Sequence, residues 1–380
     1  MEFKINKDNW EKVTLGEIVF EPKETAKDII AEGFEHILGL EHIVSGDVHL
    51  RNSFSNDTDT TFTKVFRAGD ILFGRRRAYL KKAAQASFDG VCSGDITVMR
   101  ANNKLDVRLL PFVIHNEKFF DYAVKHSAGG LSPRVKFKDL ANYEFLLPPK
   151  KQQAELAELL WAMDEVIEKD LEVLKRLEGG YDSIIAKELL NKNGFKFIFK
   201  ENTEVIRGVS FKPETLVSNG VAILRSNNIK DSKINFDDTI YLPLSNVDNK
   251  KLLNKNDFAI CMSNGSKELV GKSAIISEMI YDHIAVGAFC AGLKVKVEFV
   301  DLVKHLLNSN VYRNLISQIL SGSTINNLKP SDIEGLTFAV NLGFKEIVEK
   351  LNVLSLNKEK IESKLQSSKA LQKALINQIF

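Results

Sequence analysis

Three adjacent arginines, Arg75, Arg76 and Arg77, are the residues of this chain best suited to binding a negatively charged partner. With Lys81 and Lys82 they belong to a basic segment: residues 64–82 hold seven basic side chains against one acid, whereas residues 28–63 hold seven acids against one base. A guanidinium group can donate two parallel hydrogen bonds to a phosphate or to the edge of a guanine. The cluster therefore favours contact with DNA over a basic loop that is merely solvated.

Further polar side chains with this chemistry lie on loops elsewhere in the chain. Ser132, Arg134 and Lys136 follow Gly129-Gly130, which would let the backbone approach a partner closely. In the second half of the chain we expect DNA contacts from Arg225, Asn227, Asn228, Asn264, Ser266, Lys267, Lys272, Ser323, Asn326, Asn327 and Lys329. Asparagine suits the hydrogen-bonding edge of adenine as arginine suits that of guanine. Residue type does not separate base-reading side chains from phosphate contacts, so both roles stay open.

Motifs for catalysis are missing beside these binding residues. An adenine methyltransferase holds its target base in an Asn/Asp-Pro-Pro-aromatic loop, but Pro148-Pro149 lies between a leucine and a lysine. The stretch from Gly265 to Ser273 is one residue too long for a phosphate-binding loop and continues into a strand-like run rather than a helix. His36, His42 and His49 lie six and seven residues apart, and the sequence implies no carboxylates beside them that would complete a metal site. We therefore interpret them as solvent-facing or hydrogen-bonded histidines. We therefore expect no catalytic residue, no metal ion and no cofactor.

Composition bounds the class of protein without deciding it. The chain has 380 residues, 44% hydrophobic and 27% charged, with a net charge of +2, so it is long enough for two cores but not strongly basic. Cys92, Cys261 and Cys290 are too far apart in sequence for a zinc knuckle. No apolar run approaches the roughly 20 residues that span a membrane, and the first residues do not resemble a signal peptide. These features predict a cytoplasmic protein with reduced thiols and no membrane contact.

An internal repeat organises the whole sequence. Segments of the first half recur in the same order in the second half, and each copy ends in a long helical pattern. The matched pairs are Gly33–Leu38 with Gly220–Leu224, Gly69–Phe73 with Asn256–Ile260, Cys92–Gly94 with Cys290–Gly292, Asp139-Leu140 with Asp332-Ile333, and Phe145 and Leu147 with Phe338 and Val340. Each pair is weak alone, but their shared order indicates a duplicated domain.

The body of each copy reads as mixed α/β, an α+β fold with short strands. We expect strands at residues 71–73, 96–99 and 143–147 in the first copy, and at 258–262, 274–276 and 293–297 in the second. A helix should precede the last strand of each copy, at residues 109–125 and 302–320.

Two long amphipathic helices follow the two copies. Apolar residues three and four positions apart run from Gln152 to about Leu190 and from Ile347 to Ile379. Gly179-Gly180 predicts a kink or local break in the first helix. If the apolar stripes pair, the helices must be antiparallel, and the chain end then returns to the first copy. The alternative is that each helix packs only on its own domain.

These features together resemble the specificity subunit of type I restriction-modification systems. The opening residues 10–18 resemble the family's first strand, and residues 129–149 resemble the close of a target recognition domain. Gln152-Gln153, Leu156-Ala157, Leu160 and Asp164 match the start of the conserved helix, which usually has Glu-Gln where this chain has Gln-Gln. The second copy opens at residues 208–211 and closes at 322–340, where Asn341-Leu342-Gly343 replaces the prolines.

The resemblance implies a division into four parts: recognition domain one at residues 1–150, a spacer helix at 151–193, recognition domain two at 194–342 and a second spacer helix at 343–380. It implies a protein that is not an enzyme itself. Each domain would read one half of a bipartite, asymmetric sequence in double-stranded DNA. The helices would set the distance between the halves and bind two methyltransferase (M) subunits, and restriction (R) subunits would complete the complex. The alternatives are a DNA-processing enzyme and a coiled-coil scaffold or decoy of the same family.

Overall fold

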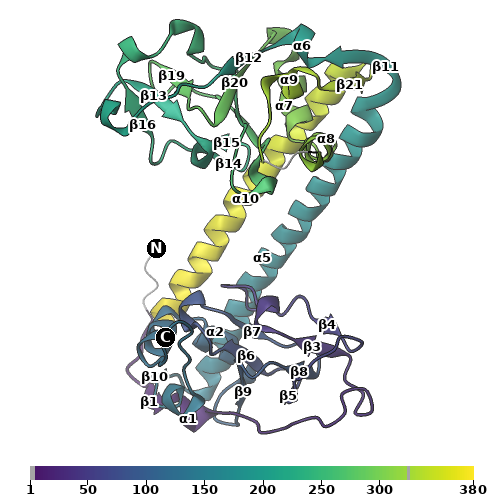
Figure 1. Cartoon of the computed structure of the whole chain (residues 1–380). Helices are drawn as coiled ribbons and strands as arrows, with labels where there is room; N and C mark the ends of the chain where they lie inside the picture. The colour runs from purple at the N-terminus through teal and green to yellow at the C-terminus, as the bar shows by residue number, and fades with distance from the viewer. Residues whose placement is uncertain (1–4, 323–325) are drawn as a thin grey trace. The chain divides into compact units, whose positions relative to one another are not determined.

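The computed structural model of the chain describes residues 5–322 and 326–380. Its contacts divide the chain into two compact units (Figure 1). Unit 1 comprises Met1–Leu171 and Ser363–Phe380, and unit 2 comprises Glu172–Glu362. The two long helices, α5 (Lys150–Ile184) and α10 (Phe344–Ile379), each contribute to both units. Each unit is described by itself below.

Unit 1 is built on two four-stranded sheets and a two-stranded ribbon. The sheet orders are β2-β9-β6-β7 and β4-β3-β8-β5, and β1 pairs with β10 in the ribbon. The strands are β1 (Glu11–Thr14), β2 (Val19–Phe20), β3 (His36–Leu38), β4 (Phe54–Ser55), β5 (Lys64–Phe66), β6 (Ile71–Gly74), β7 (Ala83–Gln85), β8 (Gly90–Cys92), β9 (Ile96–Ala101) and β10 (Glu144–Leu147). The short helices are α1 (Leu15–Ile18), α2 (Leu110–Ile114), α3 (Glu117–Lys125) and α4 (Phe137–Leu140). Only β3 and β8 run parallel among these strand pairs.

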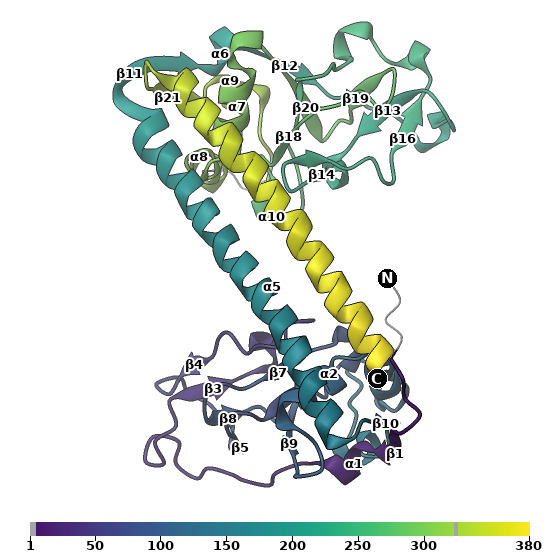
Figure 2. The same cartoon turned by 180° about the vertical axis from the view of Figure 1, so that it is seen from behind.

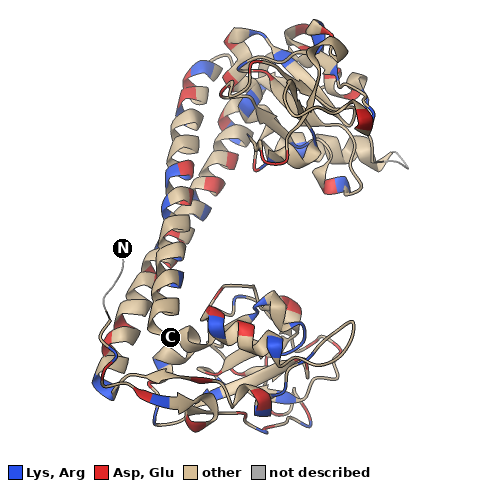
Figure 3. Ribbon diagram, turned by 90° about the vertical axis from the view of Figure 1, so that its left-hand side faces the viewer, with Lys and Arg blue, Asp and Glu red and all other residues tan. Residues whose placement is uncertain are grey.

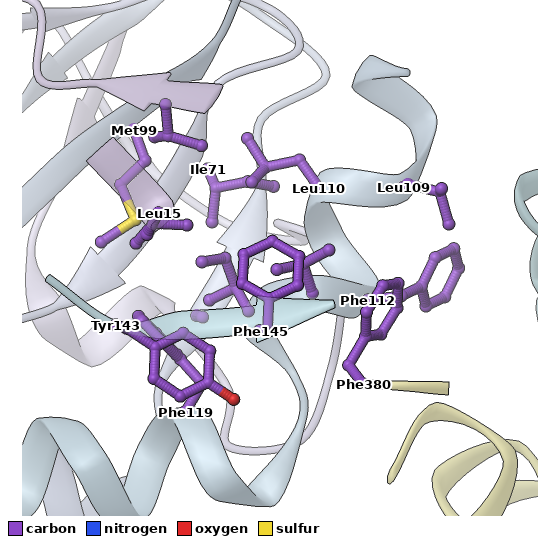
Figure 4. Close-up of a cluster of buried hydrophobic side chains, with 14 of the residues drawn as sticks. Leu15, Ile71, Met99, Leu109, Leu110, Phe112, Phe119, Tyr143, Phe145 and Phe380 are labelled. Atoms are coloured by element: carbon purple, nitrogen blue, oxygen red, sulfur yellow. The ribbon is translucent and has the colours of Figure 1, made fainter. Parts of the chain in front are cut away.

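The core of unit 1 also takes in the end of the chain (Figure 4). Phe380 meets Phe145 of β10 edge-on, with ring centroids 6.1 Å apart. The Phe380 carbonyl accepts a hydrogen bond from Nζ of Lys118 at 3.2 Å, and Oδ1 of Asn377 accepts one from the backbone of Glu117 at 2.8 Å. The predicted return of the second helix to the first copy is therefore confirmed.

Unit 2 repeats the same plan with a larger sheet. Its sheet orders are β12-β20-β17-β18-β15-β14 and β16-β13-β19, and β11 pairs with β21. The strands are β11 (Leu190–Ile198), β12 (Thr203–Arg207), β13 (Val221–Leu224), β14 (Ile229–Lys230), β15 (Lys233–Ile234), β16 (Ile240–Leu242), β17 (Phe258–Cys261), β18 (Ser273–Ile275), β19 (Ile284–Val286), β20 (Cys290–Val295) and β21 (Thr337–Val340). The short helices are α6 (Phe199–Asn202), α7 (Val300–Leu307), α8 (Asn310–Ser321) and α9 (Pro330–Glu334).

Strand pairing confirms the internal repeat and corrects one of its matches. In both units a central strand, β6 or β17, lies between two antiparallel neighbours, and the second sheet contains one parallel pair, β3-β8 or β13-β19. In the parallel pairs Leu38 lies opposite Cys92, and Leu224 lies opposite Val286. Cys92 therefore corresponds to Val286. The expected match of Cys92 with Cys290 is wrong, because Cys290 lies on the next strand, opposite Cys261.

The turns before the central strands are also the same. Gly69 and Asn256 both have positive φ, 93° and 74°, in the left-handed region that favours glycine and asparagine. The next residues, Asp70 and Asp257, both accept a backbone hydrogen bond from the residue three positions earlier, at 2.8 and 2.7 Å. The sequence match at this turn therefore reflects one local conformation.

Each helix expected before the last strand is instead a pair of helices. Asn116 separates α2 from α3, and its side chain accepts a hydrogen bond from the backbone of Phe119. Ser309 separates α7 from α8 and accepts one from Tyr312. These side chains cap the second helix of each pair. The apolar pattern continues through the break between the helices, so the sequence pattern alone does not show it. The strand expected at residues 293–297 begins earlier, as β20.

The first long helix does not break at Gly179-Gly180. Its α-helical hydrogen bonds continue to Ile184 and are followed by a π-helical turn at Ile185–Leu189. The residues on either side of the glycines are held in place: Glu178 binds Nζ of Lys358 at 2.9 Å, and Tyr181 bonds to His305. These contacts offset the weak helix propensity of glycine, which costs about 1 kcal/mol per residue.

The two long helices pair antiparallel within each unit (Figure 2). In unit 1, Asp170 binds Lys364 at 2.8 Å and the Leu160 carbonyl accepts a hydrogen bond from Gln372 at 3.3 Å. In unit 2, Glu178 of α5 binds Lys358, and Glu188 of the π-helical turn that follows α5 binds Lys350. Rising numbers on α5 meet falling numbers on α10 in both units, so the antiparallel prediction is confirmed. Among residues 5–322 and 326–380, no helix is long and apolar enough to cross a membrane.

Candidate nucleic-acid interface

Three loops meet at one place in each unit, held by matching backbone hydrogen bonds. In unit 1, the amide of Arg75 donates to the Asp95 carbonyl at 3.0 Å, and the Arg75 carbonyl accepts from Val135 at 3.0 Å. In unit 2, Met262 donates to Phe289 at 2.9 Å and accepts from Leu328 at 2.7 Å. We call these places the unit 1 junction (residues 75–77, 93–95 and 128–136) and the unit 2 junction (residues 262–267, 287–289 and 326–329).

The unit 1 junction is an arginine cluster around one carboxylate. Asp95 accepts hydrogen bonds from Arg134 at 2.8 Å and from Arg76 at 3.2 Å. Arg76 also donates to the Ser132 hydroxyl at 3.2 Å. Partial burial opposes ionisation of Asp95, but the hydrogen bonds from the two guanidinium groups outweigh it and lower the pKa of the carboxyl. Because both arginines stay partly exposed, Asp95 fixes their direction without covering them.

The other basic residues around the unit 1 junction have separate roles. Arg77 is exposed, and its left-handed backbone (φ 54°) is held by a hydrogen bond from its amide to the Pro133 carbonyl. Lys136 is exposed at the N-cap position, just before α4. Nε of Arg75 donates to the Val135 carbonyl at 3.1 Å, so Arg75 braces the junction from within. Basic and acidic residues are interspersed along the ribbon of the unit (Figure 3).

Lys81 and Lys82 are tied to neighbouring elements. Nζ of Lys81 binds Glu117 at 3.2 Å, and Nζ of Lys82 donates to the Leu40 carbonyl at 2.9 Å. In unit 2, Lys272 donates in the same way to the Ile229 carbonyl at 2.8 Å. Lys82 and Lys272 are equivalent, because their carbonyls accept from Gly74 and Cys261 at the ends of the matched central strands. We interpret this lysine pair as bracing the fold rather than as contacting a ligand.

The unit 2 junction borders a cleft of about 670 Å³. Three of the expected residues, Arg225, Asn227 and Asn264, line it together with the ring of Phe289. The Asn264 amide donates to the Ser226 hydroxyl at 2.9 Å, and its oxygen accepts from the backbone of Ser266 at 3.0 Å. These three sequence-predicted residues of the second copy therefore gather at one surface.

The remaining expected residues of unit 2 divide between this surface and the interior. Asn326 donates to the Gly265 carbonyl at 3.1 Å, while Lys267, Asn327 and Lys329 are exposed around the junction. Asn228 is a correction, because it is fully buried. Its amide donates to the Asn235 and Asp237 carbonyls at 2.9 and 3.0 Å, and its oxygen accepts from Arg225. Ser323 lies outside the described residues.

Other sequence features have structural roles. His36 bonds to Ser53 at 2.9 Å, and His49 bonds to Asp164 at 2.7 Å, which raises the pKa of the His49 imidazole. In the part of the chain that the structure describes, no group of three or more His, Cys, Asp or Glu side chains is placed to hold a metal ion. The stretch that resembles a phosphate-binding loop leads into β18 rather than a helix.

Comparison with known proteins finds a domain family that matches the part of the chain containing the unit 1 junction. Residues 7–178 match the type I restriction modification DNA specificity domain. Over 159 residues the chain is 33% identical to the type I restriction enzyme EcoKI specificity subunit of Escherichia coli K12, covering 40% of this chain and 34% of that protein. Over 352 residues it is 23% identical to the MjaVIII specificity subunit of Methanocaldococcus jannaschii, covering 83% and 78%. Over these residues the chain is similar to type I specificity subunits.

Solved structures support the same fold over the full chain. The alignment with the type I restriction-modification S subunit from M. genitalium covers 100% of this chain and 98% of that protein, with a TM-score of 0.59 at 15% identity. That likeness shows the fold alone. The alignment with the EcoKI subunit spans about a third of that protein, so its activity and partners do not transfer directly to this chain.

Two residues of the junctions were missed by the sequence reasoning: Asp95 and Phe289. They occupy the same position, because the carbonyls of Asp95 and Phe289 accept from Arg75 and Met262 at the ends of the matched strands. The mistaken match of Cys92 with Cys290 displaced the two copies by four residues at this loop. Aligning the copies on the apolar runs of β8 and β19 would have paired the aspartate with the phenylalanine.

Proposed function

We propose that this chain is the non-catalytic DNA-recognition subunit of a type I restriction-modification complex. Each recognition domain reads one half of a bipartite, asymmetric DNA target. Residues 1–150 and 194–342 are the two recognition domains, and residues 151–193 and 343–380 are the spacer helices. The complex acts in the cytoplasm, where a reducing environment suits the three free cysteines.

One observation carries this proposal: the two junctions share a backbone scaffold but present different side chains. Unit 1 presents the guanidinium groups of Arg76 and Arg134, whereas the equivalent residues of unit 2 are Ser263 and Asn327, which pair across the junction in the same antiparallel bridge. Arginine and asparagine match different base edges. A repeated scaffold with exchanged side chains is what an asymmetric, two-part sequence requires.

The long helices are the proposed docking sites for two M subunits, with R subunits joining the assembled complex. On α5, Leu159 and Val166 are exposed apolar residues seven positions apart, and therefore lie on one face of the helix. On α10, Val353 and Leu356 are exposed and three positions apart. Exposed apolar residues on one face of a helix are typical of a surface that a protein partner covers.

The decisive experiment is to assemble the purified chain with its M subunit and supply a labelled methyl donor and DNA of random sequence. We expect methylation at one bipartite sequence with the assembled complex, and a protected footprint over both halves. The chain alone should transfer no methyl groups. Methyl transfer or cleavage by the chain alone would overturn the non-catalytic assignment, and methylation without sequence preference would overturn the recognition role.

A further inference from the structure

Phe289 is a large apolar side chain held in solvent on a fixed backbone. Its side chain is 70% exposed. Its carbonyl nevertheless accepts two hydrogen bonds, from the amides of Met262 at 2.9 Å and Ser263 at 3.2 Å. The amide of the next residue, Cys290, donates to the Gly287 carbonyl at 2.8 Å. These bonds hold the backbone of the loop in place, and the exposed ring is available to a ligand.

The surroundings of Phe289 suit an anionic partner with both polar and apolar groups. The cleft beside the ring is lined by Phe211 and Pro213 and by the polar residues Arg225, Asn227 and Asn264. None of the described lining residues carries a carboxylate. Arg225 provides a positive charge, and its buried Nε has no hydrogen-bond partner among the described residues.

The equivalent place in unit 1 has opposite chemistry. There Asp95 organises Arg76 and Arg134 through hydrogen bonds. In unit 2 the carboxylate is replaced by a phenyl ring, and both arginines by uncharged polar residues. An interface of this composition cannot use guanidinium forks on guanine at these positions. At these positions unit 2 presents the hydroxyl of Ser263, the amide of Asn327 and the projecting ring of Phe289.

One DNA base presents an apolar group in the major groove: thymine, through its 5-methyl. The paired adenine presents the donor and acceptor that an asparagine amide matches. We propose that the unit 2 junction reads an A·T pair, with the ring of Phe289 packed on the thymine methyl and the exposed amide of Asn227 bonded to the adenine edge. The proposal rests on the recognition function proposed above and adds the base that unit 2 reads.

The test removes the 5-methyl group of thymine from the DNA and, separately, the ring of Phe289 from the protein. The complex of full-length chain and M subunit is assayed on its selected target and on targets in which each thymine of the second half-site is replaced, one at a time, by deoxyuridine. In the wild-type complex we expect one replacement to weaken binding about 4-fold, the value of one buried methyl-sized group. In the Phe289→Ala complex, thymine and deoxyuridine at that position should bind equally.

Two further variants make the result specific. Phe289→Leu keeps an apolar side chain and should retain part of the preference for thymine. Val297→Ala removes a side chain that is 84% exposed in the same unit but lies away from the cleft, and should leave the preference unchanged. The melting temperature and M-subunit assembly of each variant are measured in parallel, and both should match the wild type.

Several outcomes would overturn the proposal. One is that the half-site read by unit 2 contains no thymine, and another is that replacing thymine with deoxyuridine does not weaken binding of the wild-type complex. A loss of affinity on that replacement that persists in Phe289→Ala would also contradict the proposal. Loss of assembly in Phe289→Ala would assign the ring to a protein partner instead. If the wild-type complex binds the selected and a scrambled target equally, the proposed function fails and this proposal with it. Sequence-specific binding without the methyl coupling would overturn only the reading by Phe289.

Discussion

The hydroxyl of Tyr181 lies 2.8 Å from Nδ1 of the fully buried His305. On the other side of the imidazole, Nε2 of His305 is 3.0 Å from the side-chain oxygen of Asn352. The Asn352 amide in turn donates to Asp301 at 3.2 Å. This chain of bonds assigns the imidazole proton to Nε2 and leaves Nδ1 to accept from Tyr181. It joins α5, α7 and α10 within unit 2, so the sheets of that unit are linked to both helices.

Replacing Tyr181 with phenylalanine should destabilise unit 2. The change leaves Nδ1 of His305 buried without a donor, which costs about 2 kcal/mol. The unfolding midpoint in urea should fall accordingly. Tyr281→Phe is the control, because its hydroxyl accepts from Tyr241 at a partly exposed site. Equal midpoints for the two variants would show that the bond to His305 contributes nothing particular.

Two buried histidines should make the protein sensitive to mild acid. Burial lowers the pKa of His115 in unit 1 and of His305 in unit 2 to about 4, from an ordinary value of 6.5. Between these values the unfolded chain binds a proton that the folded chain does not. The contribution of each neutral histidine to the free energy of unfolding is therefore fully present above pH 6.5. It is lost as the pH drops toward 4, by up to ~3 kcal/mol for each histidine.

This pH effect is checked by denaturant unfolding across the interval from pH 7 to pH 4. His115→Gln and His305→Gln should each remove part of the slope, because glutamine does not titrate. His126→Gln is the control, since His126 is exposed. A slope that persists in the double His115 and His305 variant would assign the acid sensitivity to other groups.

The arginines of unit 1 should separate by role. Arg76→Ala and Arg77→Ala should weaken binding to the first half-site by ~1–3 kcal/mol if they read bases, or reduce the salt dependence by about one unit of slope if they contact phosphate. Arg75→Ala should instead lower the melting temperature, because its Nε braces the Val135 carbonyl. Affinity and salt dependence are measured with both half-sites varied independently.

The matched control for charge is Lys12→Ala. Lys12 is exposed and pairs with Glu144 on the β1–β10 ribbon, away from the unit 1 junction. The Lys12→Ala substitution removes one positive charge, as each arginine-to-alanine substitution does. If Lys12→Ala weakens binding as much as Arg76→Ala does, the effect is one of net charge and the junction has no special role.

The helices should set the spacer only when they are lengthened together. Four residues added after Leu174 extend α5 by about 6 Å and turn its far end by a net ~40°. The ion pairs Asp170–Lys364 and Glu178–Lys358 lie on either side of that point, so α10 needs the same insertion, after Ile361. The preferred spacer should then grow by one or two base pairs, at about 3.4 Å each, with both half-sites unchanged.

Site selection on random DNA measures this spacer directly. Two residues added to each helix would turn the apolar face by ~200° and should disrupt the pairing. Four residues added to α5 alone should break one of the two ion pairs and lower the melting temperature. An unchanged spacer in a folded variant with both four-residue insertions would mean that the helices do not measure the distance.

Local signals in the sequence predicted the fold class and much of the repeat. The turns at Gly69 and Asn256 and the apolar runs ending at Leu38 and Leu224 recur because they form the same structure. The match of Cys92 with Cys290 failed because both are buried strand cysteines, and residue type does not reveal which strand holds them. Register is set by pairing partners distant in sequence.

The candidate interface was only partly visible in the sequence for a related reason. Arg76 and Arg134 stood out because charge is conspicuous in any segment. Phe289 did not, since a phenylalanine beside a strand is ordinarily part of the core. Asn228 has the chemistry of a DNA contact but faces inward. Direction relative to the core depends on tertiary packing, and single residue types do not encode it.

The backbone bonds that close each junction do not involve the side chains at positions 76, 95 and 134, or at 263, 289 and 327. Mutations at these positions can therefore accumulate without the fold being rebuilt. A lineage carrying this chain could acquire a new half-site by a few substitutions in one unit and keep the other half-site and the helices as inherited. Under the proposed function, the duplicated scaffold therefore allows each half of the DNA target to change independently of the other.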